Sequence, residues 1–214
     1  MLVACWSVKG GSGTTVVATA LALVTARRSL GGALLADLAG DVPAVLGLPE
    51  PVGPGLLQWA AAGPQVGGEA LARLEQPVAP KLTLLARGEG GAGVLDAWEN
   101  GERLLAALSA APDASDRTVF VDCGAPGASL SLLVVRPCYL ALRRAVASAV
   151  RPSAVILVDE PGRALDRRDV EDALGVPVRA VVRTSDTVAR AVDAGLLAAR
   201  MPRDLARALA TAAE

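Results

Sequence analysis

The sequence predicts an α/β protein with a doubly wound, mostly parallel sheet flanked by helices. Short apolar runs alternate with longer helical patterns along the chain, and a glycine-rich turn separates the first apolar run from the first helix. Strands that alternate with helices favour parallel β-α-β units. Several runs consist almost entirely of Val, Leu and Ile, as expected for strands covered on both faces.

Length and composition fit one core. The chain has 214 residues, which suits a single domain over residues 1–214. Apolar residues make up 52% of the chain and aromatic residues 2%, so Ala, Leu and Val must fill the core. The formal net charge is -1, and no overall electrostatic case for nucleic-acid binding follows.

The expected elements follow from apolar runs bounded by glycine and proline. In the first half we predict, in order, a strand at 2–8, a helix at 14–29, a strand at 33–36, helices near 56–61 and 69–74, a strand at 82–86 and a helix at 94–110. In the second half we predict strands at 118–121, 132–135, 153–158 and 178–182, and helices near 140–149, 166–174, 187–199 and from 204.

The cysteines and the N-terminus indicate a cytosolic protein. Cys5, Cys123 and Cys138 lack C-x-x-C spacing, and the chain has no histidine, so the common zinc sites cannot be assembled. We expect all three thiols to be reduced and buried. The first residues have no basic n-region and too few apolar residues to span a bilayer. We therefore expect neither export nor membrane insertion.

The strongest motif is a glycine loop between the first strand and the first helix. It reads Lys9-Gly10-Gly11-Ser12-Gly13-Thr14-Thr15. Glycines let successive backbone N–H groups point at one anion, and the helix adds its positive N-terminal end. A tight turn that binds nothing is the alternative, but such a turn would not need three glycines and two threonines at this spacing. The loop therefore predicts phosphate binding.

This loop resembles the deviant phosphate loop of the ParA/MinD family of P-loop ATPases. The resemblance implies that Lys9 reaches across a dimer interface to the partner's nucleotide, and that the loop residues 9–15 bind ATP with Mg²⁺. Lys9 is one of only two lysines in the chain, the other being Lys81. In the general P-loop motif a lysine stands where this chain has Thr14, whereas Thr15 keeps the hydroxyl that binds magnesium.

Two aspartates at strand ends match the family's acidic positions. Asp37 resembles the first aspartate of switch I, and Asp122 resembles the aspartate that ends the Walker B strand, so Thr15, Asp37 and Asp122 are the implied metal site. An aspartate at the end of an apolar strand is also a common cap. The second switch I aspartate is replaced by Ala39, and Asp41 has the wrong spacing to substitute for it. With Thr14 and Ala39 at these positions, we expect at most a weak ATPase.

The later segments leave the base and the partner open. Asp159 and Glu160 lie where relatives place an asparagine that reads adenine, so the resemblance allows ATP, GTP or no base at all. The Gly-Thr-Thr ending of the loop and the stretch 37–48 resemble the TadZ/CpaE branch. That branch implies a scaffold that positions assembly of a Tad (Flp-type) pilus.

Two other roles stay open at this stage. A DNA-partition ParA would need clustered basic residues on one face, and two groups of arginines qualify: Arg143, Arg144 and Arg151, and Arg163, Arg167 and Arg168. Because acidic residues lie among them, a solvated helix face is the favoured interpretation of both. A MinD-type division switch would need an amphipathic basic tail, but the tail 203–214 is more typical of a packing helix. We expect a cytoplasmic homodimer, recruited to the membrane or pole by a protein partner.

Overall fold

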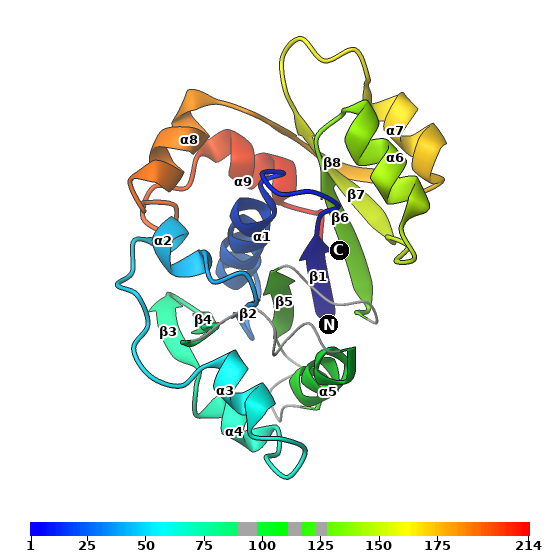
Figure 1. Ribbon diagram of the computed structural model, residues 1–214. Helices are drawn as coiled ribbons and strands as arrows, with labels where there is room; N and C mark the ends of the chain where they lie inside the picture. Colours follow the sequence, from blue (N-terminus) through cyan, green and yellow to red (C-terminus); the bar gives the residue numbers. More distant parts are fainter. Residues whose placement is uncertain (90–97, 111–116, 123–127) are drawn as a thin grey trace.

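The computed structural model describes residues 1–89, 98–110, 117–122 and 128–214 and contains one eight-stranded sheet (Figure 1). The strands are β1 (Leu2–Trp6), β2 (Ala33–Asp37), β3 (Gln76–Ala79), β4 (Leu82–Leu85), β5 (Thr118–Asp122), β6 (Leu130–Val135), β7 (Ala154–Asp159) and β8 (Val178–Arg183). Their order across the sheet is β3-β4-β2-β5-β1-β6-β7-β8. Every neighbouring pair is parallel except β3 and β4, which confirms the predicted mostly parallel sheet.

Helices cover both faces of this sheet (Figure 1). They are α1 (Thr14–Arg28), α2 (Val42–Leu46), α3 (Leu56–Ala61), α4 (Glu69–Ala72), α5 (Trp98–Ser109), α6 (Tyr139–Ala147), α7 (Arg167–Leu174), α8 (Asp186–Asp193) and α9 (Arg203–Leu209). Helices α1, α2, α8 and α9 pack on one face. The other face carries α3, α4 and α5 toward the β4 side and α6 and α7 toward the β8 side. The sheet is therefore doubly wound.

The central strands are buried on both sides because their residues alternate between two apolar clusters. In β5, Phe120 packs into the cluster around α1, whereas Val119 and Val121 pack against α3, α4 and α5. In β1, Val3 faces α1 and Leu2 faces the opposite layer. This explains why these segments are continuous apolar runs and show no alternation of apolar and polar residues.

Two short elements were missed in the sequence. Helix α2 spans five residues, has a proline in its first turn and ends at Gly47, which has a φ of 70°. Strand β3 lies at the sheet edge, where its exposed Gln76 and Pro77 give no apolar signal. Proline is tolerated there because an edge strand needs fewer ladder hydrogen bonds.

Some predicted boundaries were also wrong. Strand β1 ends at Trp6 and not at residue 8, because the chain turns into the glycine loop. The helix expected at 187–199 ends at Asp193, and Gly195 follows with a left-handed φ of 63°. The first part of the helix expected at 94–110 lies outside the described residues. The other predicted helices and strands are confirmed to within a few residues.

The turn after α8 and the end of α2 approach each other through two glycines. A Cβ built on Gly47 would lie 2.2 Å from the carbonyl oxygen of Gly195. A Cβ on Gly195 would lie 2.6 Å from the Cα of Gly47. No side chain fits at either position, so this contact sets the distance between α2 and α8.

The thiols follow the expectation only in part. Cys5 is buried, whereas Cys138 is only half-buried, because it precedes α6 at the end of the sheet. Cys123 lies outside the described residues. Among the helices that the structure describes, none is long and apolar enough to cross a membrane.

Candidate functional site

The predicted site residues meet at the carboxyl ends of three adjacent strands. In the order β2-β5-β1, the first strand ends at Asp37, the second at Asp122, and the third leads into the glycine loop. Asp37 and Asp122 are paired in the register of β2 and β5. Carboxyl ends of parallel strands are where open α/β sheets bind ligands. The sheet order thus brings both predicted carboxylates beside the loop.

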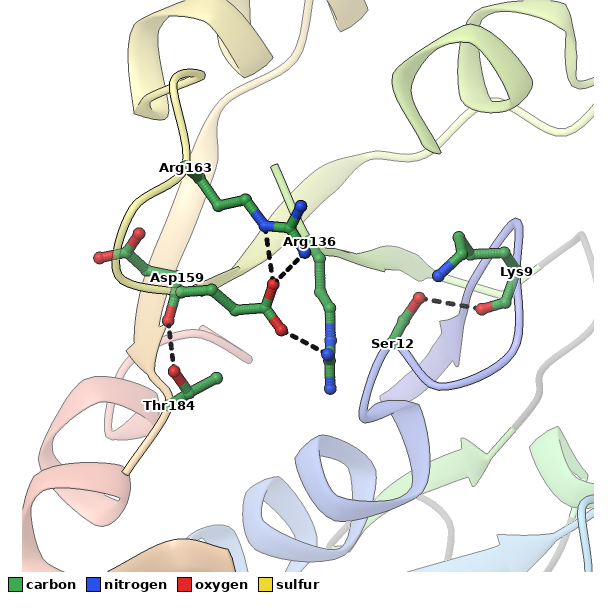
Figure 2. A network of polar contacts seen from close by, with 7 residues as sticks. Lys9, Ser12, Arg136, Asp159, Arg163 and Thr184 are labelled. Carbon is green, nitrogen blue, oxygen red and sulfur yellow. Dashed lines mark hydrogen bonds and ion pairs between the residues drawn. The ribbon is translucent and has the colours of Figure 1, made fainter. Parts of the chain in front are cut away.

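The glycine loop is held by its own serines. The hydroxyls of Ser7 and Ser12 both donate to the carbonyl oxygen of Lys9, at 3.1 and 2.9 Å. Gly11 and Gly13 have φ values of 74° and 87°, which side chains rarely adopt. Figure 2 shows the Ser12 contact with Lys9 at the start of the loop. These two hydrogen bonds and the two left-handed glycines help to fix the loop conformation.

The glycines also leave open space over the loop. A Cβ built on Gly10, Gly11 or Gly13 would meet nothing within 4 Å. Packing of neighbouring residues therefore does not explain these glycines; the positive φ values account for Gly11 and Gly13, and the space above all three leaves room for an anion. This space is the fit that a phosphate group requires.

Helix α1 begins at this loop with a free N-terminal end. Its N-cap is Gly13, no side chain caps its first N–H groups, and its first turn carries no acidic residue. Thr14 is buried and Thr15 is half-buried in that turn. The uncapped N–H groups and the helix dipole both favour an anion at this end. Residues 9–15 can therefore cradle a phosphate group even though Thr14 brings no charge.

Asp37 is fully buried and tied to the loop that follows it. Its two carboxylate oxygens accept backbone N–H groups of Gly40 and Val42, at 2.6 and 3.1 Å. Burial raises the pKa of Asp37 to about 6, although these two hydrogen bonds act to lower it. Asp37 is therefore mostly ionised at neutral pH, at a cost to folding. Asp122 is equally buried beside it.

The loop after Asp37 is held by an arginine that the sequence did not reveal. The Nη1 atom of Arg87, which follows β4, donates to the carbonyl oxygen of Ala39 at 2.8 Å. Its charge also lowers the pKa of Asp37 slightly. Asp41 is exposed at the start of α2, so it does not replace the aspartate missing at Ala39.

The three side chains predicted to hold a magnesium ion all carry oxygen donors. Thr15 offers a hydroxyl, and Asp37 and Asp122 offer carboxylates, which are hard oxygen ligands of the kind that Mg²⁺ prefers. The described residues contain no cluster of three or more His, Cys, Asp and Glu. A metal held here would therefore keep water and phosphate ligands, as Mg²⁺ usually does.

Glu160, which follows β7, binds two arginines, Arg136 and Arg163, both labelled in Figure 2. Its Oε1 atom pairs with Arg136, which follows β6, and its Oε2 atom accepts the Nε of Arg163 at 2.8 Å. The hydrogen bond from Arg163 holds the pKa of Glu160 below its usual range, and the charges of Arg136 and Lys9 act in the same direction. Lys9 lies across from this network in Figure 2.

This network changes the expectation for base recognition. Both oxygens of Glu160 are engaged by arginines, and the carboxylate of Asp159 points away from the loop in Figure 2. The backbone oxygen of Asp159 accepts the hydroxyl of Thr184 at 3.1 Å. In this arrangement neither acidic side chain is free to read a guanine edge.

A hollow of about 200 Å³ lies between the glycine loop and the ends of β6, β7 and β8. Its walls are largely apolar, and Arg136 and Gly13 form part of them. The lining residues are Gly13, Val16, Val17, Arg136, Val158, Val182, Arg183, Thr184, Ser185, Val188, Ala189, Val192 and Asp193. An apolar hollow beside a phosphate cradle can accept the planar part of a ligand.

Solved structures with the same fold were found at low sequence identity. A ParA family ATPase from Chlorobium tepidum TLS superposes with a TM-score of 0.76 at 16% identity, covering 100% of this chain and 97% of that one. The septum site-determining protein MinD with Mg-ADP from Pyrococcus horikoshii OT3 gives 0.76 at 17%, covering 99% and 93%. MinD in the MinC:MinD complex of Aquifex aeolicus gives 0.72 at 16%, covering 99% and 93%.

A scan against protein-family models and a search of curated proteins gave no match. The structural similarity spans the whole chain and nearly the whole of each neighbour, so this chain has the fold of ParA and MinD ATPases.

Proposed function

We propose that this protein is a ParA/MinD-like switch or scaffold that binds a nucleoside triphosphate with Mg²⁺ and hydrolyses it slowly or not at all. One observation carries the proposal: an open glycine loop at the N-terminus of α1 lies beside two paired, buried carboxylates, Asp37 and Asp122. The neighbour that was solved with Mg-ADP supports the same ligand class.

Different residues bind different parts of the ligand. The backbone of residues 10–15 surrounds the phosphates, and Thr15, Asp37 and Asp122 hold the magnesium ion. That ion would neutralise phosphate charge. Lys9 of one subunit reaches the phosphates held by the partner subunit, so that ligand binding and dimerisation are linked.

Slow hydrolysis follows from two positions. Thr14 brings no positive charge to the transferring phosphoryl group, and Ala39 brings no carboxylate to orient the attacking water. The Ala39 backbone is also tied to Arg87. The protein therefore acts through the bound state, in which the dimer presents a surface to a partner.

Two biological roles are open to such a dimer. The Gly-Thr-Thr ending of the loop and the stretch 37–48 favour positioning of a Tad pilus, as in the TadZ/CpaE branch. The structural neighbours include a ParA family ATPase and a MinD solved with MinC, and they favour partition or division positioning. In either role the chain works in the cytoplasm and is recruited by a protein partner.

The decisive experiment is calorimetric titration with ATP and with GTP, each with magnesium, alongside a mass measurement of the oligomer. We expect micromolar binding by the wild-type protein and a dimer that forms only with nucleotide. Lys9→Ala should lose the dimer. Lys81→Ala is the matched control, because Lys81 is the other lysine of the chain and directly precedes β4, at the opposite end of the strands from the glycine loop. Failure of both nucleotides to bind the wild-type protein would overturn the proposal.

A further inference from the structure

Arg136 occupies the side of the glycine loop that faces away from the carboxylates. Because β1 lies between β5 and β6, Asp122 flanks the loop on one side and Arg136, directly after β6, flanks it on the other. In Figure 2 the Arg136 side chain extends toward the start of α1, on the side where Ser12 and Lys9 lie. The loop therefore has an acidic flank and a basic flank.

The Arg136 guanidinium has hydrogen-bonding capacity to spare. Its Nη1 atom pairs with Glu160, and its side chain is 35% exposed. Its Nε atom is buried and has no hydrogen-bond partner among the described residues. Arg136, together with Gly13 and Val16, lines the hollow beside the loop. A guanidinium has five N–H donors in a planar fork that matches phosphate oxygens.

The network formed by Glu160, Arg136, Arg163 and Lys9 has a net positive charge. One carboxylate faces Arg136 and Arg163 directly, and Lys9 is near enough to lower the pKa of Glu160. Of the two arginines bound to Glu160, only Arg136 lines the hollow next to Gly13. The lining also includes Arg183 and Asp193, so Arg136 is the residue through which the network around Glu160 reaches the hollow.

We propose that Arg136 supplies the phosphate-binding charge that Thr14 does not provide. The ligand is the polyphosphate of the nucleotide, so this inference rests on the proposed function. In the ligand-free protein Glu160 holds the guanidinium at the edge of the hollow. On binding, the phosphate oxygens take the place of Glu160 as acceptors, and Glu160 stays paired with Arg163.

This arrangement predicts opposite effects for the two partners of one ion pair. Arg136→Gln removes the cation and keeps a side chain of similar reach. Glu160→Gln removes the competing carboxylate and leaves Arg136 free for the ligand. Arg163→Gln is the matched control, because it removes the other arginine bound to Glu160, and Arg163 does not line the hollow.

The test is calorimetric titration of the wild-type protein and these three variants with MgATP, MgADP and inorganic tripolyphosphate at several salt concentrations. We expect Arg136→Gln to weaken binding of all three probes by about 10- to 100-fold, as expected for a lost charge-assisted hydrogen bond. Its affinity should also fall less steeply with salt. Glu160→Gln should bind more tightly, and Arg163→Gln should bind like wild type.

The outcomes distinguish a failure of this inference from a failure of the proposed function. If the wild-type protein binds MgATP and Arg136→Gln binds equally well or better with an unchanged salt dependence, Arg136 is no phosphate ligand and only this inference falls. If the wild-type protein binds none of the probes, the proposed function falls as well. Thermal unfolding of each variant checks that the loss reflects binding and not a damaged fold.

Discussion

Asp37 and Asp122 are paired across β2 and β5, so two fully buried carboxyl groups lie at neighbouring strand ends. Burying a carboxylate costs free energy unless charges or donors compensate it, and two side by side cost more. We propose that both groups serve one cation, the magnesium ion of the proposed function.

We expect Asp122→Asn to remove the magnesium dependence of nucleotide binding. The amide removes one negative charge from the metal site. The gain in affinity that Mg²⁺ provides should therefore be about tenfold smaller than in the wild-type protein. The measurement is ATP titration with magnesium and with a chelator. Asp159→Asn serves as the control, because its carboxylate points away from the loop (Figure 2). Equal magnesium dependence in both variants would contradict the assignment.

The free energy of unfolding should depend on pH because of Asp37. Burial raises its pKa to about 6, so the folded chain holds this proton more tightly than the unfolded chain does. The resulting contribution to the free energy of unfolding is largest below the usual aspartate pKa and is lost as the pH rises through about 6. Between about pH 4.5 and about pH 7.5 the loss amounts to roughly 2 kcal/mol.

The measurement is the free energy of unfolding of wild type and Asp37→Ala across this pH range, in the absence of magnesium and nucleotide. Relative to the variant, the wild-type protein should become less stable as the pH rises. A difference between the two proteins that does not change with pH would show that Asp37 titrates as an ordinary aspartate.

Restoring two side chains should raise hydrolysis. Thr14→Lys returns a cation to the loop, and Ala39→Asp returns a carboxylate to the segment after Asp37. Charge at the transferring phosphoryl group stabilises the transition state, and a carboxylate can orient the attacking water. We expect the double variant to release phosphate at least about tenfold faster than wild type. Thr14→Gln with Ala39→Asn, which lacks both charges, is the comparison, and an equal rate in the two double variants would refute the explanation for slow turnover.

The contact between α2 and α8 should tolerate no side chain. Gly47→Ala places a Cβ 2.2 Å from the carbonyl oxygen of Gly195. Overpacking of this kind costs about 1–3 kcal/mol. Gly53→Ala is the matched control, since Gly53 also has a positive φ but a Cβ there meets nothing within 4 Å. Chemical unfolding of both variants should show the larger loss for Gly47→Ala, and equal losses would mean that backbone strain alone explains them.

The phosphate loop and the two aspartates were predictable because their signals are local. Glycines at fixed spacing between an apolar run and a helix identify the loop, and an aspartate that ends an apolar run identifies a strand end. Short elements gave no such signal. Helix α2 and strand β3 span five and four residues, and a proline interrupts each of them.

Arg87 and Arg136 could not be recognised as parts of the site from their neighbours in the chain. Arg87 acts on the carbonyl of Ala39, 48 positions away, and Arg136 pairs with Glu160, 24 positions away. These contacts depend on which strands are neighbours in the sheet. The same sheet order places two arginines against the carboxylate oxygens of Glu160. From the sequence alone, Glu160 was still a candidate for contacting the nucleotide base.

The sequence by itself determined the α/β class, the glycine loop at residues 9–15 between a strand and a helix, and the acidic strand ends, because apolar runs, glycine spacing and strand-end residues act over a few neighbouring positions. Only the tertiary structure decided that Asp37 and Asp122 lie side by side and that Arg136 flanks the loop opposite them. The physical reason is the strand order β2-β5-β1-β6, which brings together residues as far apart in the chain as Gly13 and Arg136.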